Sequence, residues 1–133
     1  MQLLFMARYS IDKRKSIIKI SVILSTSKDK RLITMALDTG ASYTMIPWET
    51  AEALGLQPEI STKKANMITA SGIEKVPVVT VDSIRTFGKL VNNVEVIVHD
   101  LPPKSHVDGL LGLSFLKHFK LTVDFRNGYL EIE

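Results

Sequence analysis

The sequence predicts an all-β fold that closes into a barrel and carries one or two short helices. Segments of β-branched residues, such as 16-SIIKISVIL-24, recur at short spacing and are separated by turn residues. Only two segments have the composition of helices, and both are short. Short strands at this spacing are typical of a closed, mostly antiparallel sheet.

The first expected element is a hairpin. Its arms are 16–24 and 31-RLITMAL-37, and the polar sequence 25-STSKDK-30 is the turn between them. The second arm ends at Asp38. The hairpin is therefore expected to deliver a carboxylate at the end of a buried strand.

The remaining elements follow in order. A short helix is expected over 47-PWETAEALGL-56, because Pro47 suits a first helical turn and Gly55 suits the position after a helix end. Pro77 indicates an edge or a bulge in the strands that follow. Those later elements are two arms in 63–81 around 70-ASG-72, two arms in 83–102, a helix over 113-LSFLKHF-119 and a hairpin over 120–133 on the Asn127-Gly128 turn.

Length and composition indicate one domain over residues 1–133, with 1–15 as an N-terminal extension. The 133 residues are 45% hydrophobic and 23% charged, as in ordinary globular domains. There is no cysteine, and no apolar segment approaches the roughly 20 residues that span a membrane. The N-terminus lacks the features of a signal peptide. A cytoplasmic protein without a membrane partner is expected.

Positive charge is concentrated near the N-terminus. Residues 1–35 contain eight lysines and arginines against two acidic residues. This excess would suit nucleic acid or an anionic membrane. A solvated hairpin turn explains it better, because no aromatic residues for base stacking lie between the basic ones. No nucleic-acid partner is expected.

The sequence 35-MALDTGASYTMIP-47 places one carboxylate, Asp38, between an apolar run and a glycine. Asp-Thr-Gly also suits an ordinary turn, so the tripeptide by itself is a weak signal. Its surroundings strengthen the signal, because small residues follow it and a second apolar-apolar-glycine element ends at Gly112, 74 residues after Asp38. We interpret Asp38 as a functional carboxylate.

Three segments in this order resemble the signature sequences of the retroviral-type, or retropepsin-like, aspartic proteases. They are 37-LDTGAS-42, 67-MITASGI-73 and 108-DGLLGLSFL-116, and the resemblance covers roughly residues 16 to 133. The chain is most similar to non-viral, bacterial-type members. The resemblance implies a retropepsin-like acid-protease barrel with a flap hairpin. It also implies a homodimer that hydrolyses bonds in extended, mostly apolar segments of a peptide or protein substrate, without cofactor or metal.

The resemblance implies a role for each matching residue. Asp38 resembles the catalytic aspartate, Thr39 the threonine that hydrogen-bonds across the dimer, and Gly40 the glycine whose carbonyl meets the substrate. Leu111 and Gly112 resemble the structural element beneath the active-site loop. The substrate-binding residues are expected in this loop and in the flap: Gly40, Ala41, Ser42, Ile68, Thr69, Ala70, Ser71, Gly72 and Ile73.

Two positions depart from the viral pattern. Viral enzymes commonly pair an Asp two residues after the triplet glycine with an Arg after the later glycine. Ser42 and Leu113 occupy these positions. Both partners differ together, which avoids an unpaired charge. The substrate-anchoring role of that Asp is therefore open for Ser42.

Peptide hydrolysis of this kind needs two carboxyls, one to take a proton from water and one to polarise the scissile carbonyl. Within the chain, Asp108 precedes its apolar pair instead of following one, and Asp82 and Asp124 alternate within strands and are expected to face solvent. An intrachain pair stays an alternative. A two-fold dimer places Asp38 beside its own mate without further sequence.

Other chemistries find little support in the sequence. His99, His106 and His118 have no metal-like spacing and no cysteine partner. No serine lies in a nucleophile-elbow pattern. Trp48 is expected to pack the first helix onto the barrel and not to contact substrate. Two rival hypotheses remain: a retropepsin-like peptide-binding module with little or no turnover, and a protease domain cut from a larger precursor.

Overall fold

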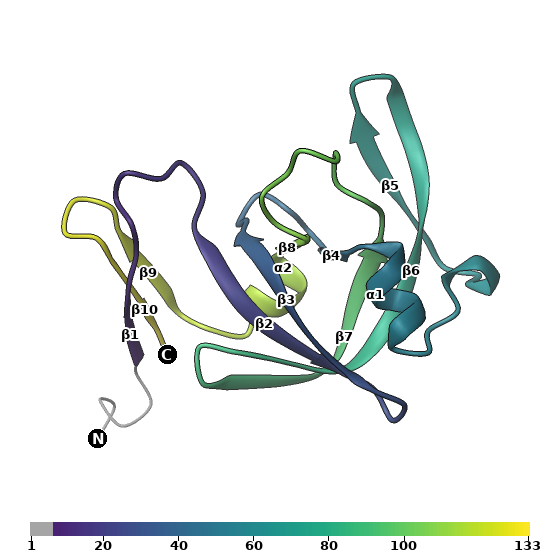
Figure 1. The fold of residues 1–133 in the computed structure, drawn as a ribbon, viewed down its shortest axis with the longest axis horizontal. Helices are drawn as coiled ribbons and strands as arrows, with labels where there is room; N and C mark the ends of the chain where they lie inside the picture. Colours follow the sequence, from purple (N-terminus) through teal and green to yellow (C-terminus); the bar gives the residue numbers. More distant parts are fainter. Residues whose placement is uncertain (1–6) are drawn as a thin grey trace.

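The computed structural model describes residues 7–133, whose strands form two sheets (Figure 1). The larger sheet closes on itself, because β2 pairs with both β3 and β6. In sheet order its strands are β2 (Lys19–Ser25), β3 (Lys30–Leu37), β8 (Gly109–Leu111), β4 (Thr44–Ile46), β7 (Lys89–Val98), β6 (Gly72–Thr86) and β5 (Lys64–Thr69). The first six form a closed barrel, which confirms the predicted all-β fold.

The first predicted hairpin is confirmed as β2 and β3. The two strands are antiparallel, with Ile20 opposite Met35. Along β2, Ile20, Val22 and Leu24 are buried and alternate with exposed residues. Each buried aliphatic side chain of this size contributes about 1.5–3 kcal/mol relative to its exposed form. The alternation therefore fixes which face of the hairpin lines the barrel.

Strand β8 joins the two halves of the barrel beneath the expected active-site loop. It runs parallel to β3, with Leu37 opposite Leu111, and antiparallel to β4, with Met45 opposite Leu110. The segment 38–43 connects β3 to β4, so it leaves and re-enters the sheet on either side of β8. This arrangement holds Asp38 at the end of β3.

The prediction of four separate arms between residues 63 and 102 is wrong. Strand β6 is one continuous strand of 15 residues that includes the first arm predicted in 83–102. It pairs with β5 from Gly72 to Pro77 and with β7 from Val78 onward. Pro77 has no N–H to donate, and it lies where the partner strand changes. Figure 1 shows the β5–β6 hairpin projecting from the barrel.

Three short helices cover the barrel: α1 (Trp48–Ala53), the 3-10 helix η2 (Pro58–Ile60) and α2 (Leu113–Leu116). Pro47 precedes α1 as its N-cap and lies outside the first turn predicted for it. Gly55 follows α1 with a φ of +76°, a conformation that favours glycine. Trp48 is partly buried against the core, as predicted. Helix α2 is shorter than the predicted 113–119, because residues after Leu116 form turns that lead into β9.

The second sheet contains both ends of the described chain. Its order is β1 (Ala7–Ser10), β10 (Tyr129–Ile132) and β9 (Leu121–Asp124), all antiparallel. The hairpin predicted on Asn127-Gly128 is confirmed as β9 and β10. Residues 7–10 of the expected extension are a strand of this sheet, and Met1 to Met6 lie outside the described residues. Arg8 pairs with Glu131 and stacks on the Tyr129 ring, 4.1 Å from its centroid.

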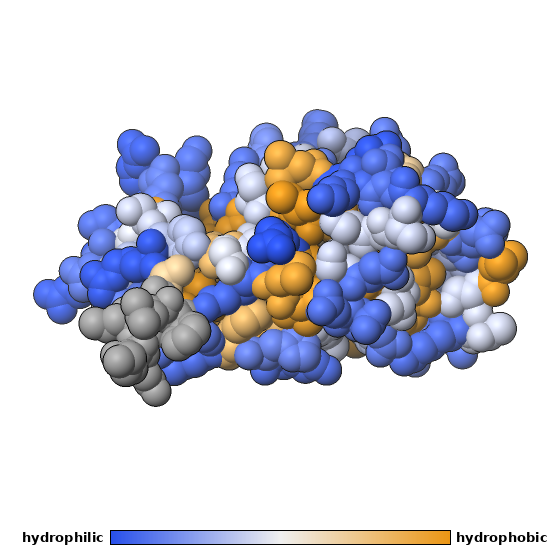
Figure 2. Space-filling view, turned by 90° about the horizontal axis from the view of Figure 1, so that it is seen from below, coloured by the Kyte–Doolittle hydropathy of each residue, from blue (hydrophilic) through white to orange (hydrophobic). Residues whose placement is uncertain are grey.

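The interior of the barrel is a continuous apolar core. Its largest fully buried side chains include Phe115 of α2, Leu24 of β2 and Met35 of β3. Apolar side chains also lie among hydrophilic ones on the outer face shown in Figure 2. Across the described part of the chain, no helix has the length and apolar character needed to cross a membrane.

Candidate active site

Asp38 is held by its own backbone and by the loop that it begins. Its N–H donates a 3.0 Å hydrogen bond to the carbonyl of Leu111, which continues the β3–β8 pairing by one residue. Its carboxylate Oδ1 accepts a 2.9 Å hydrogen bond from the amide of Gly40. The side chain is half-buried. The carboxylate is therefore oriented but remains accessible.

The loop after Asp38 is tight and faces outward. Thr39 and Gly40 are exposed, and Ala41 N–H donates to the Asp38 carbonyl over 3.3 Å. A Cβ at Gly40 would lie 3.3 Å from Asp38 Oδ1, a close contact. Glycine thus lets the amide approach the carboxylate. The exposure of Thr39 leaves it available for contact with another molecule.

Gly112 lies beneath this loop, where only glycine fits. A Cβ there would clash with the carbonyl oxygen of Tyr43 and lie 2.7 Å from that of Ala41. The next residue, Leu113, donates its N–H to the Ala41 carbonyl over 2.8 Å. Leu111 is fully buried. The structure thus places both Leu111 and Gly112 directly against the active-site loop.

A buried hydroxyl network fixes the far end of the loop, and no motif in the sequence indicated it. Thr44 is fully buried, and its Oγ1 accepts a 3.1 Å hydrogen bond from Gly112 N–H. Ser114 Oγ lies 3.1 Å from the same oxygen and accepts Thr44 N–H over 2.9 Å. Thr44 lies about 70 positions before Gly112 and Ser114, so only folding brings it to them.

A cleft of about 310 Å³ runs between the active-site loop and the inner side of β5. The expected residues Gly40, Ala41, Ser42 and Ile68 line it. Sequence reasoning missed most of the remaining lining residues, which are largely apolar: Tyr43, Met45, Ala65, Asn66, Met67, Ile97 and Leu110. The lining begins at Gly40, two residues after Asp38, and its apolar character suits apolar side chains.

The residues expected to form a flap lie in the hairpin of β5 and β6. Ile68 pairs with Ile73 across it, and both side chains are largely exposed, at 86% and 73%. Gly72 has a φ of +126°, and Thr69 Oγ1 donates to its carbonyl over 3.1 Å. Of the flap residues expected to bind substrate, only Ile68 lines the cleft in this conformation. The others lie at or near the exposed tip: Thr69, Ala70, Ser71, Gly72 and Ile73.

No other aspartate considered from the sequence lies beside Asp38. Asp108 exchanges hydrogen bonds with the backbone of Thr34, four residues before Asp38 on β3. At about 3.3 Å per residue, this places the two aspartates about 13 Å apart along the strand. Asp82 accepts the N–H of Ser27, and Asp124 accepts that of Asn127. All three carboxylates serve turns or strand ends.

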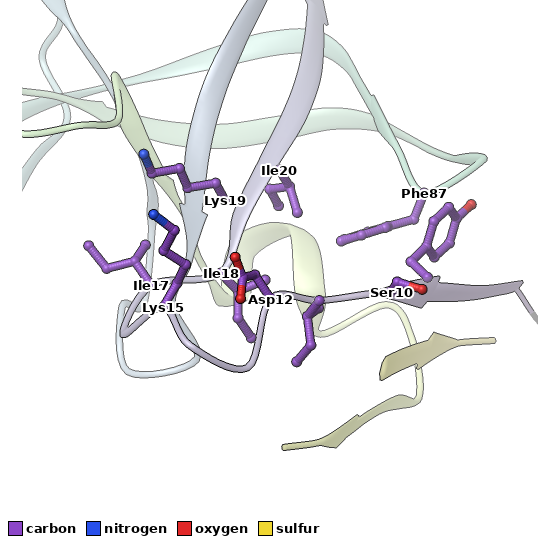
Figure 3. Close-up of a pocket in the computed structure, with 10 residues that line it drawn as sticks. Ser10, Asp12, Lys15, Ile17, Ile18, Lys19, Ile20 and Phe87 are labelled. Carbon is purple, nitrogen blue, oxygen red and sulfur yellow. The ribbon is translucent and has the colours of Figure 1, made fainter. Parts of the chain in front are cut away.

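Other cavities are present besides this cleft. One of about 240 Å³ lies between β1, the segment leading into β2 and the β6–β7 turn (Figure 3). Ile18, Ile20 and Phe87 line it, and none of the expected site residues does. Within residues 7–133 no cluster of histidine, aspartate or glutamate has the arrangement of a metal site.

The barrel, the glycine beneath the loop and the single aspartate together define the fold of a retropepsin-like aspartic protease. A solved structure described as a retropepsin-like aspartic protease from Rickettsia conorii matches it with a TM-score of 0.72. The sequences are 24% identical, and the match covers 96% of this chain and 89% of that one. At this identity the match establishes the fold.

The sequence itself matches a family over most of its length. The model of the family described as “gag-polyprotein putative aspartyl protease” matches residues 25–118. The chain belongs to this family. No curated protein was found to match it.

Proposed function

We propose that the chain is an aspartic endopeptidase that works as a homodimer, with Asp38 as its catalytic residue. The observation that carries this proposal is the position of Asp38, half-buried at the end of β3, with its carboxylate oriented by the Gly40 amide and with an apolar cleft that begins at Gly40, two residues further along the loop. Family membership and fold support the same chemistry.

The second carboxylate is supplied by Asp38 of a second copy. The other aspartates considered in the same chain accept hydrogen bonds from backbone groups away from Asp38. The loop at Asp38 and Thr39, in contrast, faces outward. A two-fold axis beside this loop brings the two Asp38 carboxyls together. Such a pair shares one proton, so one member takes a proton from water while the other polarises the scissile carbonyl.

The substrate is an extended peptide with apolar side chains near the scissile bond. Met45, Ile97 and Leu110 line the floor of the cleft, and Met67 and Ile68 of β5 line its side. Strand β5 ends the sheet, so its outer edge has no strand partner within the described chain. An extended peptide gains main-chain hydrogen bonds from such an edge.

The deciding experiment compares wild type with Asp38→Asn on a peptide library, with sedimentation velocity on both proteins. We expect cleavage by wild type, loss of cleavage in the variant, and the same dimer and thermal unfolding curve in both. A wild-type protein that binds a statine-type inhibitor but cleaves nothing would instead identify a binding module. A stable monomer that cleaves peptides would refute the shared site.

A further inference from the structure

The substrate cleft has a neighbouring cavity on the other side of Ser42 and Tyr43. We call it the outer pocket. Its volume is about 380 Å³, and it lies between the active-site loop, β7 and α2. Its lining residues are Ser42, Tyr43, Asn92, Asn93, Glu95, Leu113, Ser114, Lys117 and His118. Ser42 and Tyr43 also line the cleft, so the two cavities adjoin.

The two cavities differ in chemistry. The floor of the cleft is aliphatic, whereas the outer pocket presents two amide side chains, Asn92 and Asn93, and the polar ends of Lys117 and His118. Lys117 and His118, which directly follow α2, are both exposed. A side chain that binds there keeps its polar group in a polar, open environment.

The charged lining residues of the outer pocket are one lysine, Lys117, and one acidic residue. Its acidic lining residue, Glu95, forms an ion pair with Lys63, which lies just before β5. The hydrogen bond to Glu95 raises the pKa of Lys63. Lys117 has no ion-pair partner within residues 7–133. The cation of the outer pocket is therefore free to bind an anion.

We propose, building on the proposed function, that the outer pocket binds an acidic side chain of the peptide substrate, several residues from the scissile bond, with Lys117 as the cation. Ser42 and the two asparagines supply neutral hydrogen-bonding groups around it. In the dimer, each subunit contributes one outer pocket, and the two-fold axis places them on opposite sides of the scissile bond. The substrate class is thus an apolar segment flanked by acidic residues on both sides.

Binding of uncleavable peptides tests this proposal separately from turnover. The peptides share an apolar centre with a reduced amide in place of the scissile bond, and carry glutamate or lysine at successive outer positions. Calorimetry with wild type should show about fivefold tighter binding of glutamate-flanked peptides at one outer position, as expected for an exposed ion pair. Lys117→Glu should reverse this preference.

Lys30→Glu is the matched control, because it makes the same change of charge at the opposite end of β3 from Asp38. It should leave the preference for glutamate unchanged. Equal binding of both peptides by wild type, or no binding of either, overturns the proposal, as does a loss of preference in Lys30→Glu. Failure to cleave the parent peptide would instead count against the proposed function alone.

Discussion

The amide of Gly112 donates a 3.1 Å hydrogen bond to the hydroxyl of Thr44, 68 residues earlier in the chain. Ser114 completes the contact, because its hydroxyl accepts the Thr44 amide and lies 3.1 Å from the same Thr44 oxygen. Hydroxyl and amide groups, with no charged side chain, thus connect the active-site loop to α2.

Thr44→Val should destabilise this connection. The substitution preserves the shape of the side chain but leaves the buried N–H of Gly112 without an acceptor, at a cost of about 1–3 kcal/mol. Chemical denaturation measures the loss. Ser114→Ala should cost a similar amount, because it leaves the buried N–H of Thr44 without the Ser114 hydroxyl as acceptor. An unfolding free energy for Thr44→Val equal to that of wild type would contradict this role.

Asp108→Asn separates the structural aspartate from the proposed catalytic one. Its amide oxygen still accepts the Thr34 N–H, so we expect a folded protein with peptide cleavage near the wild-type rate. Asp108→Ala should lose about 1 kcal/mol of stability by removing that acceptor. Steady-state kinetics and thermal unfolding of both variants provide the measurement. Abolished cleavage in a folded Asp108→Asn protein would instead support the alternative in which Asp38 pairs with an aspartate of the same chain.

Ile68→Ser should weaken substrate binding without affecting the fold. The side chain is 86% exposed and lines the cleft, so its truncation changes stability by less than about 0.5 kcal/mol. It should raise KM for apolar peptides several-fold, because the flap loses its apolar contact. Ile60→Ser is the control, since Ile60 is 68% exposed and lies in η2, away from the cleft. Equal effects in both variants would argue against a flap contact.

The turn between β9 and β10 should open in acid. Hydrogen bonds from the backbone and side chain of Asn127 lower the pKa of Asp124 below 3.8. A lowered pKa in the folded state means that the stabilisation is present above about pH 3.8 and is lost as the pH falls through the folded value. Hydrogen exchange at the Asn127 amide should therefore lose protection at acid pH, and at neutral pH in Asp124→Ala. Asp82→Ala should leave that amide protected.

Local sequence chemistry predicted the parts of the fold that depend on neighbouring residues. Asn127-Gly128 predicted the last hairpin, and two segments separated by the polar turn 25–30, the first of them β-branched, predicted the first. The continuous β6 was missed because two predicted arms were separated at Asp82, which lies within the strand. Pro77 was expected to mark an edge or a bulge. In the structure, it lies at a change of partner strand, where its lack of an N–H is tolerated.

Features that depend on distant pairing were not predicted. Strand β1 is four residues long and gains its conformation from pairing with β10, over 100 residues later. The expected site residues Asp38 and Gly112 do lie at the same loop. Most residues that line the cleft were nevertheless not predicted. Met45, Ile97 and Leu110 look like ordinary core residues in the sequence, because alternation gives the face of a strand but not which face borders a cleft.

If the chain works as the proposed homodimer, the terminal sheet bears on how that dimer is regulated. Because β1 pairs with β10 of the same chain, each copy completes this sheet during its own folding and needs no strand from a second copy. Association can then follow folding as a separate, reversible step. Dilution would release intact chains, each with a single carboxyl, and renewed concentration would restore hydrolysis without any refolding. Abundance alone would thereby act as the switch for proteolysis.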